Sequence, residues 1–369
     1  MAAVDVLQVI TSATPRGAER YAVLLGHELA ERGHLVRTVA LHPGPNPTLD
    51  VEVLGRTRFG STTLRNLRAC CRRAPVVVAH GSSTLPATAV ATAGTGIPFV
   101  YRNIGDPLYW ASSWRRRLRT RALLSSASRV VALTDEAGRR VARCYGIDGS
   151  RISVIPNGVP ARDFPRRTAD EAAAARQALS VPPDSVVAVF LGALSPEKDP
   201  VAAVEAIGHL PDRWMLFVGG DGPEADRVRR AAGTVAGDRV RLLGHVTDPL
   251  ALLRAADVLV LSSVSEGLPG VIIEAALLGV PTVATDAGFV RELVRDGING
   301  FVVPVADPAA LAAALLGAEA QLEVLGSAAH DLAIGHYTLE STADRWLDVL
   351  DQVRSDGAGA HLLPWLRRR

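Results

Sequence analysis

Short, almost wholly apolar segments alternate with amphipathic segments along most of this chain of 369 residues. The first apolar segment covers residues 4–10 (VDVLQVI), which is typical of a strand in a parallel sheet that is covered on both faces. Residues 18–33 carry apolar side chains at helical spacing and end at a glycine, and residues 34–41 form the next apolar segment. A strand, a helix and a strand in this order predict a parallel pair joined by a helical crossover.

The same alternation occurs in two series, which are separated by residues 156–185, a stretch rich in proline, arginine and alanine. Strands are expected at 51–54, 75–80, 97–102, 129–134 and 151–156 in the first series and at 186–192, 214–220, 239–244, 257–263, 281–286 and 300–304 in the second. The sequence therefore predicts an α/β fold of two Rossmann-like, doubly wound domains that face a central ligand cleft. We expect residues 1–163 to form the first domain and 164–340 the second, with a final helix and basic tail over 341–369 that returns toward the first domain.

Composition and charge exclude several classes of protein. The 40 Lys and Arg residues against 38 Asp and Glu give a net charge of +2, so no basic field points to a nucleic-acid partner. The three cysteines form no CxxC pair, which disfavours a disulfide framework or a zinc site. No apolar run is long enough to cross a bilayer, and the first residues lack the basic region of a signal peptide. We expect a cytoplasmic protein of a reducing compartment.

Two glutamates, Glu266 and Glu274, stand out in the stretch SEGLPGVIIEAALLGVP. The loop with Glu266 follows the strand expected at 257–263, at the carboxyl edge where ligands of open α/β sheets bind. The next helix is apolar on every face, so Glu274 is expected to be buried and to need hydrogen-bond donors. A ribose diol offers two such donors, while the N–H groups of the first helical turn can hold a phosphate. The alternative is an arginine partner for Glu274 and a solvated loop position for Glu266.

Several ordered motifs lead from these glutamates to a family resemblance. Glu266 and Glu274 form an E-x7-E pattern, which is preceded along the chain by the segments RGAERYAVLLGHELAERGH, VIPNGV, GALSPEKDP, VGGDGPE and RLLGHVTD. Together these motifs resemble those of the retaining glycosyltransferases of family 4, which have the GT-B fold. The resemblance covers most of the chain. It implies an enzyme that moves a sugar from a nucleoside diphosphate sugar to an acceptor hydroxyl.

The resemblance also implies roles for individual positions. Glu274 would bind the ribose hydroxyls of the donor, Glu266 a hydroxyl of the transferred sugar, and Lys198 the departing diphosphate. His80 would position the sugar or the acceptor hydroxyl, unless it is a strand-end histidine bonded to the backbone. The predicted catalytic residues are therefore His80, Lys198 and Glu266. Further predicted donor-binding residues are Gly17, Arg102, Gly192, Gly244, His245, Val246, Gly267, Leu268, Pro269, Gly270 and Val271.

The donor, acceptor and cofactor follow from the same resemblance. Uridine diphosphate sugars are the favoured donors, and guanosine diphosphate sugars are the alternative. The acceptor is expected to be a cell-surface glycan, a lipid-linked precursor or a small natural product. No metal or other cofactor is expected, because side chains and helix ends stabilise the diphosphate in GT-B enzymes.

One position departs from the pattern of the family. An arginine usually stands five residues before the lysine, whereas this chain has Ala193 there. We expect Arg102 or Arg16 to supply the missing charge. Without such compensation, the sequence favours the alternative hypothesis of a catalytically silent scaffold with the same fold. A phosphorylase or hydrolase on this fold is a close relative of the favoured function, and a nicotinamide-dependent oxidoreductase is disfavoured because no GxGxxG follows the first strand.

A basic segment points to one more partner. Residues 114–124 (WRRRLRTRALL) place five arginines around apolar side chains, and the surface from Arg115 to Arg121 is suited to an anionic membrane. A solvated helix with its apolar stripe in the core is the favoured alternative, because the cluster is short and mixed. The tail HLLPWLRRR has the same two interpretations.

Overall fold

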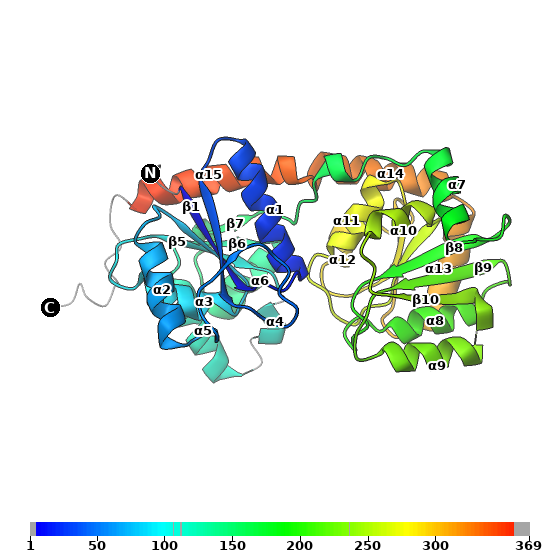
Figure 1. Cartoon of the computed structure of the whole chain (residues 1–369), viewed down its shortest axis with the longest axis horizontal. Coiled ribbons are helices and arrows are strands. Elements are labelled where there is room, and N and C mark those ends of the chain that lie inside the picture. The colour runs from blue at the N-terminus through cyan, green and yellow to red at the C-terminus, as the bar shows by residue number, and fades with distance from the viewer. Residues whose placement is uncertain (1–4, 106, 111–112, 236, 358–369) are drawn as a thin grey trace. The chain divides into compact units, whose positions relative to one another are not determined.

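A computed structural model of the chain describes residues 5–105, 107–110, 113–235 and 237–357. The chain divides into two compact units, of which the first comprises Met1–Gly158 with Leu339–Arg369 and the second comprises Val159–Thr338 (Figure 1). The first division falls after Gly158, a few residues before the boundary expected from the sequence. The tail HLLPWLRRR lies outside the described residues, so both of its interpretations stay predictions.

The first unit contains a seven-stranded sheet with the order β3-β2-β1-β4-β5-β6-β7. Its strands are β1 (Val6–Ser12), β2 (Val36–His42), β3 (Glu52–Val53), β4 (Val77–His80), β5 (Phe99–Asn103), β6 (Arg129–Ala132) and β7 (Ile152–Val154). All neighbouring strands are parallel. All residues of β4 and β5 are buried, because a parallel sheet of this kind is covered on both faces, and their polar residues His80, Arg102 and Asn103 stand at the carboxyl ends of the strands.

Helices pack on both faces of this sheet. They are α1 (Gly17–Glu31), α2 (Ser61–Cys71), α3 (Thr84–Thr92), α4 (Pro107–Trp110), α5 (Trp114–Ser126), α6 (Asp135–Tyr145) and α15 (Leu339–Gly357), with a 3-10 turn at Gly149–Arg151. One hydrophobic cluster joins Leu7 and Val9 of β1 to α2, α3, α5 and α6. A second cluster joins Val6 to α1 and α15. Because successive strand residues point to opposite faces, α1 and α15 cover one face of the sheet, while α2, α3, α5 and α6 cover the opposite face.

The second unit contains a six-stranded sheet with the order β10-β9-β8-β11-β12-β13. Its strands are β8 (Val186–Leu191), β9 (Trp214–Gly219), β10 (Val240–Gly244), β11 (Val258–Leu261), β12 (Thr282–Thr285) and β13 (Gly300–Val303). All neighbouring strands are again parallel. Both sheets therefore have the doubly wound, Rossmann-like order that the alternating sequence predicts.

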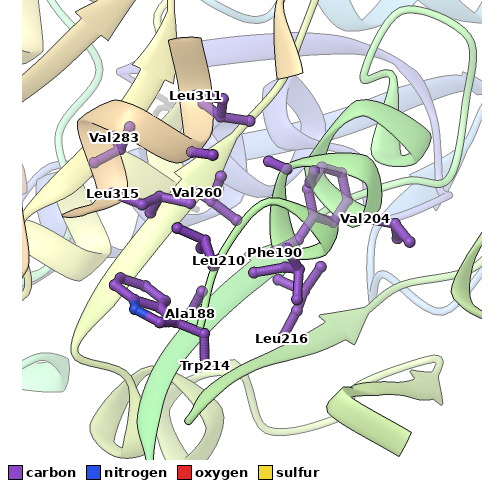
Figure 2. Packing of buried hydrophobic residues seen from close by; sticks show 14 of the residues in the cluster. Ala188, Phe190, Val204, Leu210, Trp214, Leu216, Val260, Val283, Leu311 and Leu315 are labelled. Carbon is purple, nitrogen blue, oxygen red and sulfur yellow. The ribbon is translucent and has the colours of Figure 1, made fainter. Parts of the chain in front are cut away.

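The helices of the second unit also lie on both faces of their sheet. They are α7 (Ala169–Ala178), α8 (Pro200–Gly208), α9 (Ala225–Val235), α10 (Pro249–Ala255), α11 (Gly270–Leu277), α12 (Val290–Leu293), α13 (Pro308–Glu319) and α14 (Leu322–His336), with 3-10 turns at Ala161–Asp163 and Gly237–Arg239. Figure 2 shows the core between the sheet and α8 and α13, where Phe190 and Val260 of the strands meet Val204 and Leu311 of the helices. This packing fixes the strand ends from which the loops of the unit extend.

Among the described residues, no single helix has both the length and the apolar character that crossing a membrane requires. The helices α13 and α14 meet these two criteria only as a pair, and the pair is bent by 95°.

Candidate functional site

In both sheets the strand order reverses at one point, between β1 and β4 in the first and between β8 and β11 in the second. Ligands of open α/β sheets bind beyond the carboxyl ends of the strands that flank such a point. In the second unit, residues 192–199 follow β8 and residues 262–269 follow β11. Lys198 lies on the first of these loops and Glu266 on the second. The fold therefore brings together two predicted site residues that are 68 positions apart in the sequence.

Lys198 and Glu266 form an ion pair in which Nζ lies 2.5 Å from Oε1. Ser263 donates a hydrogen bond from its hydroxyl to the same Oε1 over 2.6 Å. Glu266 is only 9% exposed, while Lys198 is half-buried. A buried carboxylate requires donors of this kind to offset its lost hydration. Glu266 is therefore not the solvated loop residue of the alternative interpretation, and Ser263 is a member of the site that the sequence did not reveal.

Backbone contacts hold the loop of Glu266 in place. The carbonyl of Glu197 accepts a hydrogen bond from Val264 N over 2.9 Å, which ties the loop after β8 to the loop after β11. Gly288 has a φ of +60°, and a side-chain carbon added there would lie 1.8 Å from the carbonyl oxygen of Glu266. Only glycine allows the chain after β12 to pack this closely. Glu266 is thus set in a rigid frame of three loops.

Glycines join three further strand ends of the second sheet. Gly192 N donates to Gly219 O over 2.9 Å, and Gly220 N donates to Gly244 O over 2.7 Å. A carbon added at Gly220, whose φ is +144°, would lie 1.8 Å from the carbonyl oxygen of Gly192. Two predicted donor-binding residues, Gly192 and Gly244, are thereby connected through Gly220. Gly220 lies in the motif VGGDGPE, where a glycine pair directly follows an apolar strand, but it was not among the predicted site residues.

Helix α11 carries Glu274 and is less buried than its apolar sequence predicts. Its buried residues are Ile272, Ile273, Ala275, Ala276 and Leu277. Glu274 is half-buried together with Gly270 and Val271, so the prediction of a fully buried carboxylate is wrong. Gly270 and Val271 share a face with Glu274 because they precede it by four and three positions. The almost wholly apolar composition of the helix does not reveal this face. A carbon added at Gly270 would lie 4.0 Å from Glu274 Oε1, so the carboxylate points back toward the start of the helix.

The other predicted residues of this unit surround the same strand ends. Leu268 and Pro269 are buried and Gly267 is half-buried, whereas His245 is exposed and Val246 half-buried. Their contacts with a donor stay predictions.

His80, at the end of β4, is buried in the first unit with 2% of its surface exposed. Its Nε2 lies 2.9 Å from Gln8 Oε1, and Gln8 Nε2 donates to the carbonyl of Ala22 over 2.8 Å. The bond to Ala22 orients the amide of Gln8, so His80 Nε2 carries a proton and Nδ1 is an acceptor without a partner among the described residues. Burial, reinforced by the neighbouring charge of Arg102, holds the pKa of His80 well below its ordinary value of 6.5. The bond to Gln8 rather than to the backbone was not foreseen, and the role at a sugar stays a prediction.

Arg102 is also buried in the first unit, with 1% of its surface exposed. Its guanidinium lies 3.7 Å from the centre of the Tyr21 ring and donates to Asn157. Tyr21 in turn accepts a hydrogen bond from Trp346 Nε1 over 2.9 Å. Burial lowers the pKa of Arg102 to about 10. The structure therefore places this guanidinium in a cation–π stack inside the unit. Its binding to a diphosphate stays a prediction.

The remaining predicted residues of the first unit lie at the start of α1. Gly17 is the first residue of this helix, and a carbon added there would meet nothing within 4 Å. Arg16 precedes it and is exposed. The predicted site thus falls into two sets, one in each unit. Among the described residues, no three His, Cys, Asp or Glu side chains are grouped so that they could hold a metal ion.

Two family profiles match the chain. The family described as Glycosyltransferase Family 4 matches residues 15–163, and the family described as Glycosyl transferases group 1 matches residues 185–319. The chain belongs to glycosyltransferase family 4. The second match lies within the second unit, which contains Lys198, Glu266 and Glu274.

Curated relatives of this family 4 chain include D-inositol 3-phosphate glycosyltransferases. The protein of Geodermatophilus obscurus is 37% identical over 253 residues, which cover 64% of this chain and 55% of the relative. The protein of Nocardia farcinica is 32% identical over 263 residues, which cover 66% of this chain and 58% of the relative. The chain thus spans little more than half the length of these relatives.

Solved structures resemble the family 4 chain over almost its whole length. HepE of Anabaena, in complex with UDP and glucose, has a TM-score of 0.83 and 22% identity over 94% of this chain and 99% of HepE. The sucrose-phosphate synthase of Thermosynechococcus elongatus has a TM-score of 0.79 and 20% identity over 95% of this chain and 100% of the synthase. At such identities the likeness shows the fold alone. The chain has the GT-B fold of two Rossmann-like units.

We predict that His80 makes the first unit less stable in mild acid. Because its pKa in the folded protein lies well below 6.5, the unfolded chain takes up the proton first as the pH falls. The free energy of unfolding should therefore decrease below about pH 6.5, by up to about 1.4 kcal/mol per pH unit. Urea titrations at pH 7 and pH 5 should show a larger loss in the wild type than in His80→Asn, whose side chain does not titrate. Equal losses in the two proteins would contradict this assignment.

Proposed function

We propose that the chain is a retaining glycosyltransferase that moves a sugar from a nucleoside diphosphate sugar to an acceptor hydroxyl. The observation that carries the proposal is the Lys198–Glu266 pair at the point where the second sheet reverses its strand order. An ammonium group offers a diphosphate a charge-assisted bond, and a fixed carboxylate beside it accepts bonds from sugar hydroxyls. Membership of family 4 supports the same chemistry.

Each residue of this set has one task in the proposed reaction. Lys198 stabilises the diphosphate as its negative charge grows in the transition state, which lowers the barrier to transfer. Glu266 accepts a hydrogen bond from the transferred sugar. Glu274, whose carboxylate points toward the first turn of α11, binds the ribose hydroxyls, while N–H groups of that turn face the diphosphate. The scheme needs no cofactor, no metal and no nucleophile from the protein, and His80 positions the sugar or the acceptor.

The donor is a uridine diphosphate sugar in this proposal, with a guanosine diphosphate sugar as the alternative. HepE binds UDP and UDP-glucose in its structures, which supports uridine. The acceptor binds to the first unit. Because curated relatives are named for D-inositol 3-phosphate, a small polyol phosphate joins cell-surface glycans, lipid-linked precursors and small natural products as the classes to test.

Helix α5 is the proposed surface for contact with an anionic membrane. Trp114 is 70% exposed and Leu118 is 61% exposed, and Leu124 is the only buried residue of the helix. The apolar side chains at the start of α5 therefore lie outside the core, whereas Leu123 and Leu124 near its end pack in the first-unit core, as the alternative interpretation expects. The exposed arginines of this helix are Arg115, Arg116, Arg117, Arg119 and Arg121. Such a combination of exposed aromatic, aliphatic and cationic groups favours a peripheral position on the cytoplasmic face of a membrane.

Replacing Glu274 by alanine should remove the stabilisation by UDP. A ligand present at 100 times its Kd stabilises the folded state by about 2.7 kcal/mol, which a thermal-shift assay detects readily. The variant should show little shift with either UDP or UDP-glucose, because the ribose hydroxyls lose their acceptor. The control is Glu205→Ala, which removes an exposed carboxylate on α8 and should retain the full shift. An unchanged shift in the Glu274 variant would mean that the ribose is held elsewhere.

Adding an arginine at position 193 should tighten the binding of UDP. Ala193 is exposed on the loop after β8, so a long side chain can be added without displacing the core. A hydrogen bond to a charged group contributes about 1.5–3 kcal/mol, so the Kd measured by calorimetry should fall by about tenfold or more. Val324→Arg adds the same charge at a site on α14 that is 68% exposed and should leave the Kd unchanged. Tight binding of UDP without any transfer in wild type or variant would favour the silent scaffold.

Replacing Arg115, Arg116 and Arg117 by glutamine should reduce co-sedimentation with vesicles that contain anionic lipids. Each basic residue near such a surface contributes about 1 kcal/mol, so the three together should lower binding by more than tenfold. Replacing three arginines of α9 (Arg227, Arg229 and Arg230) is the matched control and should change little. Equal sedimentation of both variants would exclude α5 as the membrane surface.

A further inference from the structure

In the proposed reaction, Lys198 binds the diphosphate and Glu266 binds a sugar hydroxyl. In the structure, these two groups bind each other. Nζ of Lys198 lies 2.5 Å from Oε1 of Glu266, and the side chains are 27% and 6% exposed, respectively. Among the described residues, this is the only ion pair that Lys198 makes. The ammonium has three N–H donors, of which Glu266 engages one, so a diphosphate competes with Glu266 for the position and the charge of Nζ rather than for its only donor.

We propose that the Lys198–Glu266 pair is an internal competitor for the diphosphate, which makes the site discriminate between a nucleoside diphosphate and its sugar conjugate. When a nucleoside diphosphate without a sugar binds to Lys198, Glu266 loses its ion pair with the ammonium. A nucleoside diphosphate sugar also binds to Lys198, but its sugar hydroxyl donates a hydrogen bond to Glu266 in place of the ammonium. This inference rests on the proposed function, because it concerns the same donor site.

Ser263 makes such an exchange feasible. It is fully buried and donates to the same Oε1 that Lys198 contacts, so the carboxylate keeps one bond when the ammonium leaves. The backbone carbonyl of Ser263 accepts a hydrogen bond from the hydroxyl of Thr285 over 2.5 Å, which fixes its position. Ser263 is therefore a positioning residue that retains Glu266 in place.

The two partners differ in their freedom to move. Glu266 is held by Ser263 and by the close contact of its own carbonyl with Gly288. Lys198 is more exposed and has a flexible four-carbon stem, so it is the partner that can follow a ligand. Removing one partner from a buried ion pair is costly because the remaining charge loses its compensation. That cost is greatest for the bare diphosphate, which brings no donor to Glu266.

The same exchange acts after transfer. Once the sugar has left with the acceptor, Glu266 has lost its hydroxyl donor while the diphosphate still occupies Lys198. The return of Lys198 to Glu266 then opposes the product diphosphate, so the ion pair favours product release as well as donor selection.

The inference is tested with Glu266→Gln, by calorimetric titration with UDP and with UDP-glucose in the absence of an acceptor. The amide can still accept hydrogen bonds from Ser263 and from a sugar hydroxyl, but it no longer holds the ammonium by its charge. The Kd for UDP should fall by about fivefold or more, while that for UDP-glucose should change much less, so the ratio of the two constants falls. GDP and GDP-mannose are titrated alongside. A ratio that is unchanged or larger would overturn the inference.

Ser263→Ala provides a second test that does not depend on the folding of the first variant. It leaves the ion pair intact but removes the bond that retains Glu266 when Lys198 departs. The binding of UDP should therefore weaken several-fold more than the binding of UDP-glucose. The ratio of the Kd for UDP to the Kd for UDP-glucose should rise, whereas it should fall in Glu266→Gln. An unchanged ratio would contradict the role of Ser263. If the wild type bound none of the four nucleotides, the proposed function would fail as well, whereas normal wild-type binding with unaltered ratios in both variants would overturn this inference alone.

Discussion

The parallel order of the strands is the constraint on which the rest of the molecule depends. Because all strands of a sheet run in one direction, all of their carboxyl ends lie at one edge and each connection must cross a face. Where the order reverses, two neighbouring strands send their chains to opposite faces, and the edge between them is left open. In the second unit that edge lies between β8 and β11, where Lys198 and Glu266 meet. The chemistry proposed for the protein is thus located by its topology.

The same constraint explains why most of the fold could be predicted from the sequence. A strand buried on both faces has a nearly continuous apolar sequence, so its position is marked locally. The segment 75–80 contains β4 (Val77–His80), and the segment 214–220 contains β9 (Trp214–Gly219). The apolar positions of α15 likewise indicate a helix with one buried face. They do not indicate which sheet that face covers, because this depends on residues far away in the chain.

The candidate site was less accessible, and Glu266 and Glu274 show why. The sequence placed Glu266 at the mouth of a loop and Glu274 inside the core, whereas the structure buries Glu266 and leaves Glu274 half-exposed. The burial of Glu266 results from contacts with Lys198 and with Gly288, which no local pattern encodes. His80 is a similar case, because its partner Gln8 precedes it by 72 positions. Residue types and motif spacing located the strand ends correctly, but the pairing of polar groups there is a property of the tertiary structure.

Helix α15 has a consequence for the order in which the chain can fold. Its Trp346 belongs to the cluster that covers Val6, Val78 and Val100, and it donates a hydrogen bond to Tyr21 at the start of the chain. The whole of Val159–Thr338 is synthesised between the two parts of the first unit. On the ribosome, the second unit is therefore continuous and can complete its core while the older first unit still has an uncovered face. The first unit therefore cannot bury this face until the second unit has been synthesised, although it contains the N-terminus.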